Sequence, residues 1–423
     1  MPKAVHVLAF GIFAMVTSEF AVAGLMPLMA EGLDATIPET GYLITVFAGA
    51  MALGGPFLAA AVLRLPYKTA LMVLFAVFLV GNLLAAVADG YAGMVLARVV
   101  TGVAAAAFFG VSLSLAAEIA PPETRGKAIG AVMNGLMLGT LLGLPLSTFV
   151  GNQFGWRAAF WAVSALAALA AVAAGFGVPD VPRAARAGGA PTLRQELRVF
   201  RDPRLWLVFA TSTLLIGATF AAFSYFSPIL TGLTGFTEGA VPWLLAGYGA
   251  ATVLGNAVVA RLVDRHALAL QFVGLGLNAL FLTAFALFAE SVAAAVICLV
   301  GIGLVGVTLN PCMVTRVQRT ANARPLVNTV HSSFITLGIV IGSWLGGLGV
   351  DAHGLRAPLV LGAVMALLGI LTLLPELSRT RARPSGDRTP AGRDTVPAGV
   401  APSVGQGPRR GARTGGQRPG AMS

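Results

Sequence analysis

Charged side chains are scarce in this chain of 423 residues, of which Asp, Glu, Lys and Arg together make up 11%. Soluble globular proteins carry about 25% charged residues, because their surfaces face water. So few charges cannot cover a water-facing surface of this size, and 57% of the residues are hydrophobic. A lipid bilayer removes the difficulty, because its hydrocarbon core needs no polar coat. The composition therefore excludes an ordinary soluble protein.

Cysteine and histidine are also rare, with two and four residues respectively. Cys298 and Cys312 lie fourteen residues apart in one apolar run. On a helix this separation is about 21 Å, which is too far for a disulfide. Neither cysteine has metal-ligand spacing, and the scattered histidines form no catalytic constellation. We therefore expect no metal, no cofactor and no enzymatic activity.

Nucleotide and nucleic-acid partners are disfavoured as well. The segment Gly301–Gly306 has the spacing G-x-G-x-x-G, but it lies inside an apolar run with no preceding strand and no acidic residue about 20 positions on. No P-loop is present, which argues against ATP-driven transport by this chain alone. The net charge of +11 would suit a nucleic acid, yet the basic residues sit in short segments between apolar runs.

Long apolar runs are what the chain has instead. A spanning helix needs about 20 apolar residues, and twelve runs approach that length. The first is interrupted by Glu19 and continues into further spans, so we interpret it as a helix and not as a signal peptide. The predicted spans are residues 5–27, 39–62, 69–88, 91–117, 128–151, 157–178, 204–227, 240–262, 268–289, 291–314, 327–350 and 356–375.

The loops between these spans indicate the orientation. If the N-terminus is cytoplasmic, the inner segments before residue 376 hold sixteen Lys or Arg residues and the outer segments hold two, Arg157 and Arg356. This is the asymmetry that the positive-inside rule describes. Both termini are therefore expected in the cytoplasm, in a multi-pass protein of the cytoplasmic membrane.

The domain organisation follows from the same pattern. We predict an N-terminal six-helix bundle over residues 1–178, a cytoplasmic linker over 179–203 and a C-terminal six-helix bundle over 204–375. Residues 376–423 are rich in Pro, Gly, Arg, Ser and Thr, and should form a disordered cytoplasmic tail. Contact of this tail with anionic lipid is the less favoured alternative to a solvated tail.

The two halves repeat each other at a spacing near 200 residues, as in many secondary transporters. Gly135, Gly139 and Gly143 in the fifth span match Gly338, Gly342 and Gly346 in the eleventh. At the outer ends, Gly155-Trp156-Arg157-Ala158 matches Gly354-Leu355-Arg356-Ala357. Such glycine series place small residues on one helix face and allow close helix packing.

Two charges lie clearly inside predicted spans. Glu19 is about fourteen residues into the first span, and Arg98 about seven residues into the fourth from the opposite side. At about 1.5 Å per residue both fall roughly 10–13 Å below the outer surface. Burial favours a neutral carboxyl and a nearby guanidinium favours a charged one, so this pair suits proton loading and release. A structural ion pair or a lipid-facing acid is the alternative.

Weaker signals come from polar residues in apolar surroundings. Asn134, Tyr225 and Asn310 are candidates for lining a cavity, although helix packing would explain them equally well. Asn310-Pro311 also marks a kink in the tenth span.

Several segments resemble the major facilitator superfamily over about residues 5–375, and within it the twelve-helix drug:proton antiporters. Thr17-Ser18-Glu19-Phe20 with Gly24-Leu25-Met26-Pro27 is similar to the first-helix signature of actinobacterial chloramphenicol-resistance exporters and arabinose/sugar-efflux permeases. Arg98-Val99-Val100-Thr101-Gly102 resembles a fourth-helix motif implicated in proton coupling. Gly135, Gly139 and Gly143-Leu144-Pro145 resemble the antiporter motif of the fifth helix, which bends and packs there.

The resemblance implies an all-α membrane protein with 12 transmembrane helices, in two six-helix bundles related by pseudo-two-fold symmetry. It also implies a cytoplasmic gate. The family's loop motif is degenerate after the second span, where Leu63 replaces the expected Asp and Arg64 and Lys68 remain. The second copy keeps Asp264 and Arg265, which would close the cytoplasmic side.

From these features we expect a monomeric antiporter that exports a small organic compound, such as chloramphenicol, in exchange for protons. Glu19 and Arg98 would couple the proton, with Gly135, Gly139, Gly143 and Pro145 as the antiporter helix motif. Its partners would be the small-molecule substrate, protons and the bilayer, and no nucleic acid. Sugar or nucleoside efflux is the main alternative. An importer is disfavoured by the fifth-span pattern, and a sensor by the lack of a sizeable soluble domain.

Overall fold

The computed structural model describes residues 3–181, 198–321 and 325–381. Every regular element in these ranges is helical. The helices of the first half are α1 (Lys3–Gly32), α2 (Ile37–Ala61), α3 (Tyr67–Ala86), α4 (Tyr91–Ile119), α5 (Arg125–Leu138), α6 (Leu144–Phe154) and α7 (Trp156–Gly177). Those of the second half are α9 (Pro203–Phe223), α10 (Phe226–Gly232), α11 (Val241–Leu287), α12 (Val292–Val305), α13 (Asn310–Ala321), α14 (Pro325–His353) and α15 (Ala357–Arg381).

Eleven segments of the described chain are long and apolar enough to cross a membrane, and one of them is long enough to contain two spans. The segment Glu238–Leu287 has 50 residues, which is about 75 Å of helix and more than twice a bilayer's hydrocarbon core. His266 interrupts it with non-helical angles of φ −128° and ψ 24°. The eighth and ninth spans therefore meet at His266 without the separate loop that the sequence suggested, and the count of twelve spans is confirmed.

Three further spans are interrupted. In the fifth, the π-helical turn η3 (Gly139–Gly143) separates α5 from α6. Pro145 accounts for this turn, because it lacks an N–H and its ring would clash with the carbonyl four residues back in an α-helix. In the seventh span, Ser224 and Tyr225 separate α9 from α10. In the tenth, helix α12 ends before Gly306 and the 3₁₀ turn η6 (Val307–Leu309) leads into α13. The tenth span thus breaks at Gly306, four residues before the Asn310-Pro311 pair.

The internal repeat extends to backbone geometry. Gly155 and Gly354 both have positive φ angles, of 86° and 77°, where the fifth and eleventh spans end. Glycine tolerates this conformation because it has no Cβ atom. The arginines that follow also behave alike: Arg157 donates to the Ala88 carbonyl at 2.8 Å, and Arg356 donates to the Glu290 carboxylate at 2.5 Å. Each arginine therefore ties the start of the last span of its half to the loop after the third span of that half.

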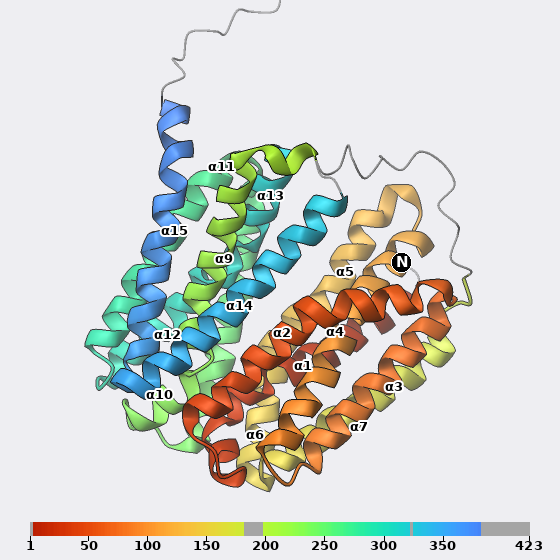
Figure 1. The fold of residues 1–423 in the computed structure, drawn as a ribbon, viewed down its shortest axis with the longest axis horizontal. Coiled ribbons are helices and arrows are strands. Elements are labelled where there is room, and N and C mark those ends of the chain that lie inside the picture. The colour runs from red at the N-terminus through yellow and green to blue at the C-terminus, as the bar shows by residue number, and fades with distance from the viewer. Residues whose placement is uncertain (1–2, 182–197, 322–324, 382–423) are drawn as a thin grey trace, which may run out of the picture. The chain divides into compact units, whose positions relative to one another are not determined.

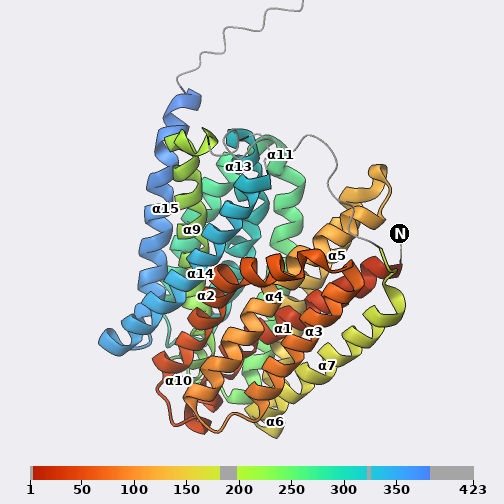
Figure 2. The same cartoon turned by 45° about the vertical axis from the view of Figure 1, so that its right-hand side comes forward.

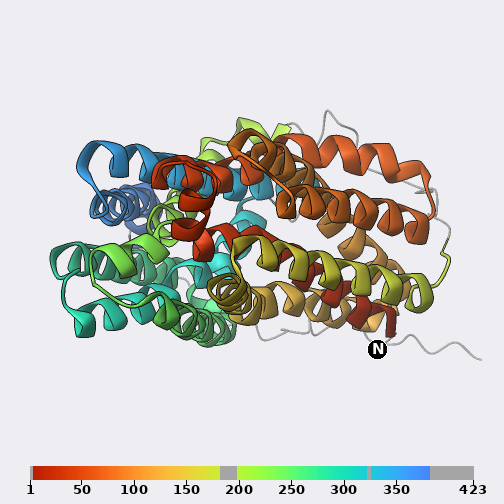
Figure 3. The same ribbon diagram turned by 90° about the horizontal axis from the view of Figure 1, so that it is seen from below.

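The two halves lie side by side, with the first half on the right of Figure 1 and the second on the left. Figures 2 and 3 show the same division from other sides. Helices α2 and α14 pack against each other along the boundary. We call the end with residues 62–66 and 198–202 the linker end, and the end with residues 33–36 and 354–356 the distal end.

Buried apolar side chains divide unequally between the halves. One cluster contains first-half residues alone, from Ala4 to Val178. A larger cluster joins the distal part of α1, including Met26 and Met29, to second-half residues such as Phe226 and Leu230. The halves therefore share an apolar core toward the distal end.

Two predicted segments fall largely outside the described residues. Most of the linker, residues 182–197, is not described, and neither are residues 382–423 of the tail. The described chain up to Ser378 belongs to one compact unit, while Arg379–Ser423 forms a second unit.

Candidate functional site

A cavity of about 500 Å³ lies between the two halves. The first half contributes α1, α5 and η3, and the second half contributes α9, α11, η6, α13 and α14. Its lining residues are Val16, Glu19, Phe20, Met133, Leu136, Met137, Thr140, Ile216, Phe220, Phe223, Tyr248, Thr252, Val253, Asn256, Val307, Thr308, Asn310, Pro311, Val314, Thr315, Ile335 and Ile339.

The chemistry of this lining is mainly apolar. Aliphatic, aromatic and methionine side chains form most of the wall, and Phe20 stacks edge-on against Phe223 at 5.4 Å between ring centroids. Neutral hydroxyl and amide groups interrupt it, among them Thr252, Asn256 and Asn310. Among the described lining residues, Glu19 is the only charged one. The cavity can therefore enclose an apolar molecule with few polar groups and offer it one carboxyl.

Arg98 lies directly behind Glu19, as the sequence predicted from their depths. Its side chain is buried, with 1% exposed, and its guanidinium lies over the Phe47 ring at 4.1 Å. Nη1 donates to the Ser18 carbonyl at 2.8 Å, and Nη2 donates to the Glu19 backbone carbonyl at 3.0 Å. The guanidinium thus binds the backbone of α1 and not the Glu19 carboxylate.

Helix α1 is also held from α3 at this level. The Ser18 hydroxyl donates to Asn82 Oδ1 at 2.7 Å, and Asn82 Nδ2 donates to the Phe78 carbonyl at 2.9 Å. Sequence reasoning missed Asn82, although an asparagine in the apolar third span is a signal of the same kind as Asn134. Ser18 and Asn82 fix the turn of α1 that precedes Glu19, and so help to direct the Glu19 side chain into the cavity.

These contacts decide between the structural interpretations of Glu19. Its side chain faces the cavity, so it is not a lipid-facing acid. No ion pair or hydrogen bond to its carboxyl is found among the described residues. Because Arg98 donates to main-chain carbonyls, the Glu19 carboxyl faces the cavity without a hydrogen-bonded partner among the described residues.

The glycine series of the fifth span packs against the cavity-forming helix α1. A Cβ atom at Gly135 would collide with the Ala9 carbonyl, one at Gly139 would lie 2.6 Å from Val16 and one at Gly143 would collide with Thr17. The second half repeats the arrangement, since a Cβ atom at Gly338 would lie 2.6 Å from the Thr213 carbonyl of α9. In both halves, therefore, small residues bring the fifth helix against the first.

Three hydrogen bonds between the halves lie toward the distal end, and a fourth, from Asn256 Nδ2 to Met137 Sδ at 3.8 Å, joins two residues of the cavity lining. The Thr45 and Ser343 hydroxyls lie 2.8 Å apart, Tyr42 donates to Asp351 at 3.4 Å, and Asn152 donates to the Glu238 carbonyl at 2.7 Å. The cavity lies on the linker side of these contacts. These contacts therefore hold the halves together on the distal side of the cavity.

The four predicted gate residues are not joined by ion pairs. Arg64, Asp264 and Arg265 are exposed, and Lys68 is half-buried. None of the four forms an ion pair within the described chain. The role of these four residues as a gate therefore stays a prediction.

Of the three candidate lining residues, Asn310 alone lines the cavity. The Tyr225 side chain is fully buried, and its hydroxyl donates to the Ser343 carbonyl at 3.0 Å, so it packs helices instead. Asn134 is exposed on α5 and is not part of the cavity lining. Both corrections have one cause: sequence position does not show which face of a helix points inward.

A further correction concerns Arg316, which the loop-charge count placed in an inner segment. Helix α13 continues to Ala321, and the Arg316 side chain within it is buried, with 3% exposed. A basic residue in the last turns of a span cannot be told from a loop residue by hydropathy alone.

Comparison with known proteins gives a consistent picture. The sequence profile described as Major Facilitator Superfamily matches residues 8–323 and 213–411. The uncharacterized MFS-type transporter YtbD of Bacillus subtilis is 32% identical over 369 residues, covering 86% of this chain and 92% of that protein. A chloramphenicol resistance protein of Streptomyces lividans is 31% identical over 348 residues, covering 82% and 88% respectively.

Among solved structures, a bacterial homologue of the human lysosomal transporter Spinster, in an inward-facing and unoccupied conformation, superposes with a TM-score of 0.74. The alignment covers 90% of this chain and 98% of that one, at 18% sequence identity. At this identity the similarity concerns the fold, which is the twelve-helix fold described above.

Proposed function

Because the chain belongs to the Major Facilitator Superfamily and is a multi-pass membrane transporter, we propose that it exports a small organic compound in exchange for protons. The substrate is an antibiotic such as chloramphenicol, and the protein lies in the cytoplasmic membrane. The protein acts as a monomer with both termini in the cytoplasm, so that the linker end faces the cytoplasm. Residues 1–178 and 204–375 are the two bundles that move against each other around the cavity.

The observation that carries this proposal is the lining of the cavity. A mainly apolar wall with a single acid suits a compound that has an aromatic or aliphatic body and few polar groups. A volume of about 500 Å³ lies within the range for drug-sized ligands. The 31% identity to a chloramphenicol resistance protein supports the same class of substrate.

Proton coupling rests on the position of Glu19. A carboxyl in an apolar cavity binds a proton readily, and it releases the proton when water or a polar ligand reaches it. In our proposal, Glu19 is deprotonated when substrate enters from the cytoplasm and protonated when the cavity faces outward. Arg98 holds the α1 backbone at this level and adds a positive field without neutralising the carboxyl.

A second candidate, sugar or nucleoside efflux, is favoured by the neutral polar groups on the second-half wall. Thr252, Asn256 and Asn310 can exchange hydrogen bonds with hydroxyl groups. A sugar presents many hydroxyls, however, and the apolar majority of the lining would leave most of them unpaired. We therefore rank this candidate second.

The test is uptake of radiolabelled chloramphenicol into everted membrane vesicles with and without a proton gradient. Glu19→Gln keeps the size and polarity of the side chain but cannot exchange a proton. We expect this variant to lose gradient-driven accumulation while it still equilibrates substrate. Glu31→Gln is the matched control, because Glu31 is an exposed acid on the same helix, and it should behave as wild type.

Two outcomes would contradict the proposal. Uphill accumulation by Glu19→Gln would exclude Glu19 as the coupling residue. If wild-type vesicles accumulate labelled pentoses or nucleosides but no amphenicol, the second candidate replaces the first.

A further inference from the structure

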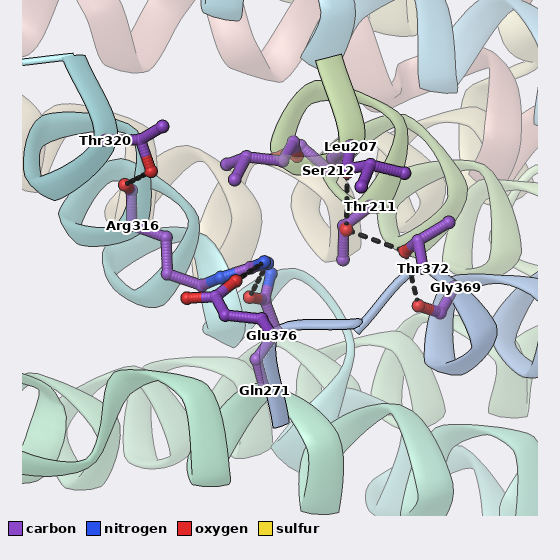
Figure 4. Close-up of polar contacts among 10 residues, drawn as sticks. Leu207, Thr211, Ser212, Gln271, Arg316, Thr320, Gly369, Thr372 and Glu376 are labelled. Atoms are coloured by element: carbon purple, nitrogen blue, oxygen red, sulfur yellow. Dashed lines mark hydrogen bonds and ion pairs between the residues drawn. The ribbon is translucent and has the colours of Figure 1, made fainter. Parts of the chain in front are cut away.

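The buried Arg316 is bound on two sides. Nη1 donates to Gln271 Oε1 at 2.6 Å, and Nη2 donates to Glu376 Oε2 at 2.5 Å. Figure 4 shows the three side chains converging from α13, α11 and α15. We call Arg316, Gln271 and Glu376 the arginine clasp. It lies in the second half near the linker end, and none of its members lines the cavity.

The clasp is an expensive arrangement to keep in a membrane protein. A buried guanidinium loses its hydration and must be compensated by partners. Here the compensation is incomplete, because Arg316 Nε and Gln271 Nε2 have no hydrogen-bond partner. An apolar residue at position 316 would pack there at a lower desolvation cost. The presence of a buried arginine that joins three helices therefore indicates a further role.

Helix α13 shows two distinct faces. Asn310, Pro311, Val314 and Thr315 line the cavity. Cys312 and Arg316, one turn apart, are buried on the side turned away from it. The face that meets the cavity is thus backed by the face that carries the clasp.

The position of α13 is not set by the rest of its own span. The tenth span is broken at Gly306, where φ is −74° and ψ is −107°, so α12 does not extend rigidly into α13. Lateral contacts must therefore hold it. Leu309 packs where Gly274 of α11 leaves room, since a Cβ atom at Gly274 would lie 2.5 Å from the Leu309 side chain. Val317 and Ala321 pack against α9, and Arg319 donates to the Asp264 carbonyl of α11. The clasp is a further lateral contact, about two turns beyond Leu309.

The partner helix α15 is itself anchored. The hydroxyls of Thr211 and Thr372 lie 2.7 Å apart and join α9 to α15, one turn before Glu376 (Figure 4). Helix α15 is therefore fixed in place by α9, and the contact between Glu376 and Arg316 holds α13 against it.

We propose that the arginine clasp positions α13 as a wall of the substrate cavity. Arg316, Gln271 and Glu376 are positioning residues that act on substrate through Asn310, Pro311, Val314 and Thr315. Opening the clasp loosens α13 and weakens substrate binding, while proton coupling at Glu19 persists. The kinetic test of this inference rests on the proposed export function, whereas the labelling test does not.

The first test measures the accessibility of a thiol on α13 and needs no substrate. Cys312 is fully buried, so its thiol should react slowly with N-ethylmaleimide. In a Cys298→Ala background, it is the only cysteine in the chain. We expect Glu376→Ala and Arg316→Met to raise the labelling rate of Cys312 by about tenfold or more, because loss of a charge-assisted contact favours local opening.

Two variants keep the result interpretable. Glu376→Gln retains an acceptor for Arg316 and should label more slowly than Glu376→Ala, which also decides the question if Arg316→Met does not accumulate in the membrane. Glu290→Ala is the matched control, because Glu290 forms the exposed ion pair with Arg356 at 2.5 Å. It should leave the labelling rate unchanged.

The second test is the kinetics of export. We expect Glu376→Ala to raise the substrate KM about tenfold with little change in the maximal rate, as a loss of ordered binding predicts. If Cys312 labelling in both clasp variants matches Glu290→Ala, the clasp does not position α13 and the inference is wrong. If labelling rises but no amphenicol is transported by wild type, the positioning role stands and the proposed substrate falls.

Discussion

The fourth and tenth spans are equivalent helices of the two halves, and each buries one arginine. Arg98 in α4 is 1% exposed, and Arg316 in α13 is 3% exposed. Arg98 lies toward the distal end and donates to two main-chain carbonyls of α1. Arg316 lies near the linker end and donates to the side chains of Gln271 and Glu376. The two cations thus use different kinds of acceptor at opposite ends of related helices.

This difference in acceptors separates two roles. A main-chain carbonyl cannot take up a proton at physiological pH, so the partners of Arg98 are permanent and the neighbouring Glu19 carboxyl stays available. A carboxylate that forms an ion pair is less available to bind a proton or a ligand. Glu376 is such a partner, because it is paired with Arg316. In our proposals, the first half therefore keeps an acid in the cavity for proton exchange, while the second half uses its acid to hold a wall of the cavity in place.

Replacing Arg98 and Arg316 one at a time should give the largest effects and should separate the two roles most clearly. Arg98→Met leaves the Ser18 and Glu19 carbonyls without their donor and removes the positive field beside the cavity acid. We expect proton-driven export to fall by about 100-fold or more, the loss of two hydrogen bonds from a charged donor. The measurement is initial uptake into everted vesicles, normalised to the amount of protein in the membrane.

Arg98→Lys supplies the finer comparison. Lysine is a point charge without the planar fork, so it can satisfy one of the two carbonyls well but not both. Its rate should fall between those of wild type and Arg98→Met. Equal maximal rates for Arg98→Met and Arg316→Met would refute the division of roles between the halves.

The glycine series should affect the two halves alike, and so tests the repeat itself. Gly135→Val and Gly338→Val each place a side chain against a main-chain carbonyl of the neighbouring helix. Overpacking of this kind costs about 1–3 kcal/mol, and both variants should lower the thermal midpoint of the detergent-purified protein by several degrees.

Gly130→Val serves as the control for this pair, because a Cβ atom at Gly130 meets nothing within 4 Å. Its midpoint should stay near that of wild type. A midpoint for Gly135→Val that equals the control value would show that α1 and α5 do not depend on close approach.

The smallest effect is expected at the exposed ion pair between Arg356 and Glu290, whose side chains are 46% and 77% exposed. Surface pairs contribute about 0–1 kcal/mol, so Arg356→Gln should change neither the midpoint nor export measurably. A large loss of stability here would mean that exposure is a poor guide to the value of ion pairs in this protein, and would weaken the contrast with Arg316.

The spans themselves were predictable from sequence because apolar length is a strong signal. The prediction of residues 91–117 for the fourth span compares with Tyr91–Ile119 in the structure. The repeat was equally visible, since Gly155 and Gly354 share both sequence context and positive φ. The depth argument also placed Glu19 and Arg98 at one level, where the structure has them in contact through the backbone.

The remaining features depend on helix rotation and on breaks that hydropathy does not register. Asp264-Arg265-His266 reads as a loop by charge, yet α11 continues through it with one non-helical residue. The break at Gly306 lies among apolar neighbours and leaves no compositional mark. The sequence left open whether Tyr225 lines a cavity or packs helices, and it placed Arg316 in a loop, because burial of a polar group depends on partners from distant helices.

The π-helical turn at Gly139–Gly143 has a consequence for insertions and deletions. In this turn the Leu144 N–H reaches back five residues to the Gly139 carbonyl, so the turn carries one residue more than an α-turn. Deleting that one residue would let the segment form a regular α-helix, and the residues after it would keep nearly their present direction, because the extra residue of a π-turn is taken up within the turn. Gly151 would still face Leu25 of α1. A single-codon deletion within these five residues should therefore be better tolerated than one elsewhere in the span, where it would rotate everything after it by about 100°.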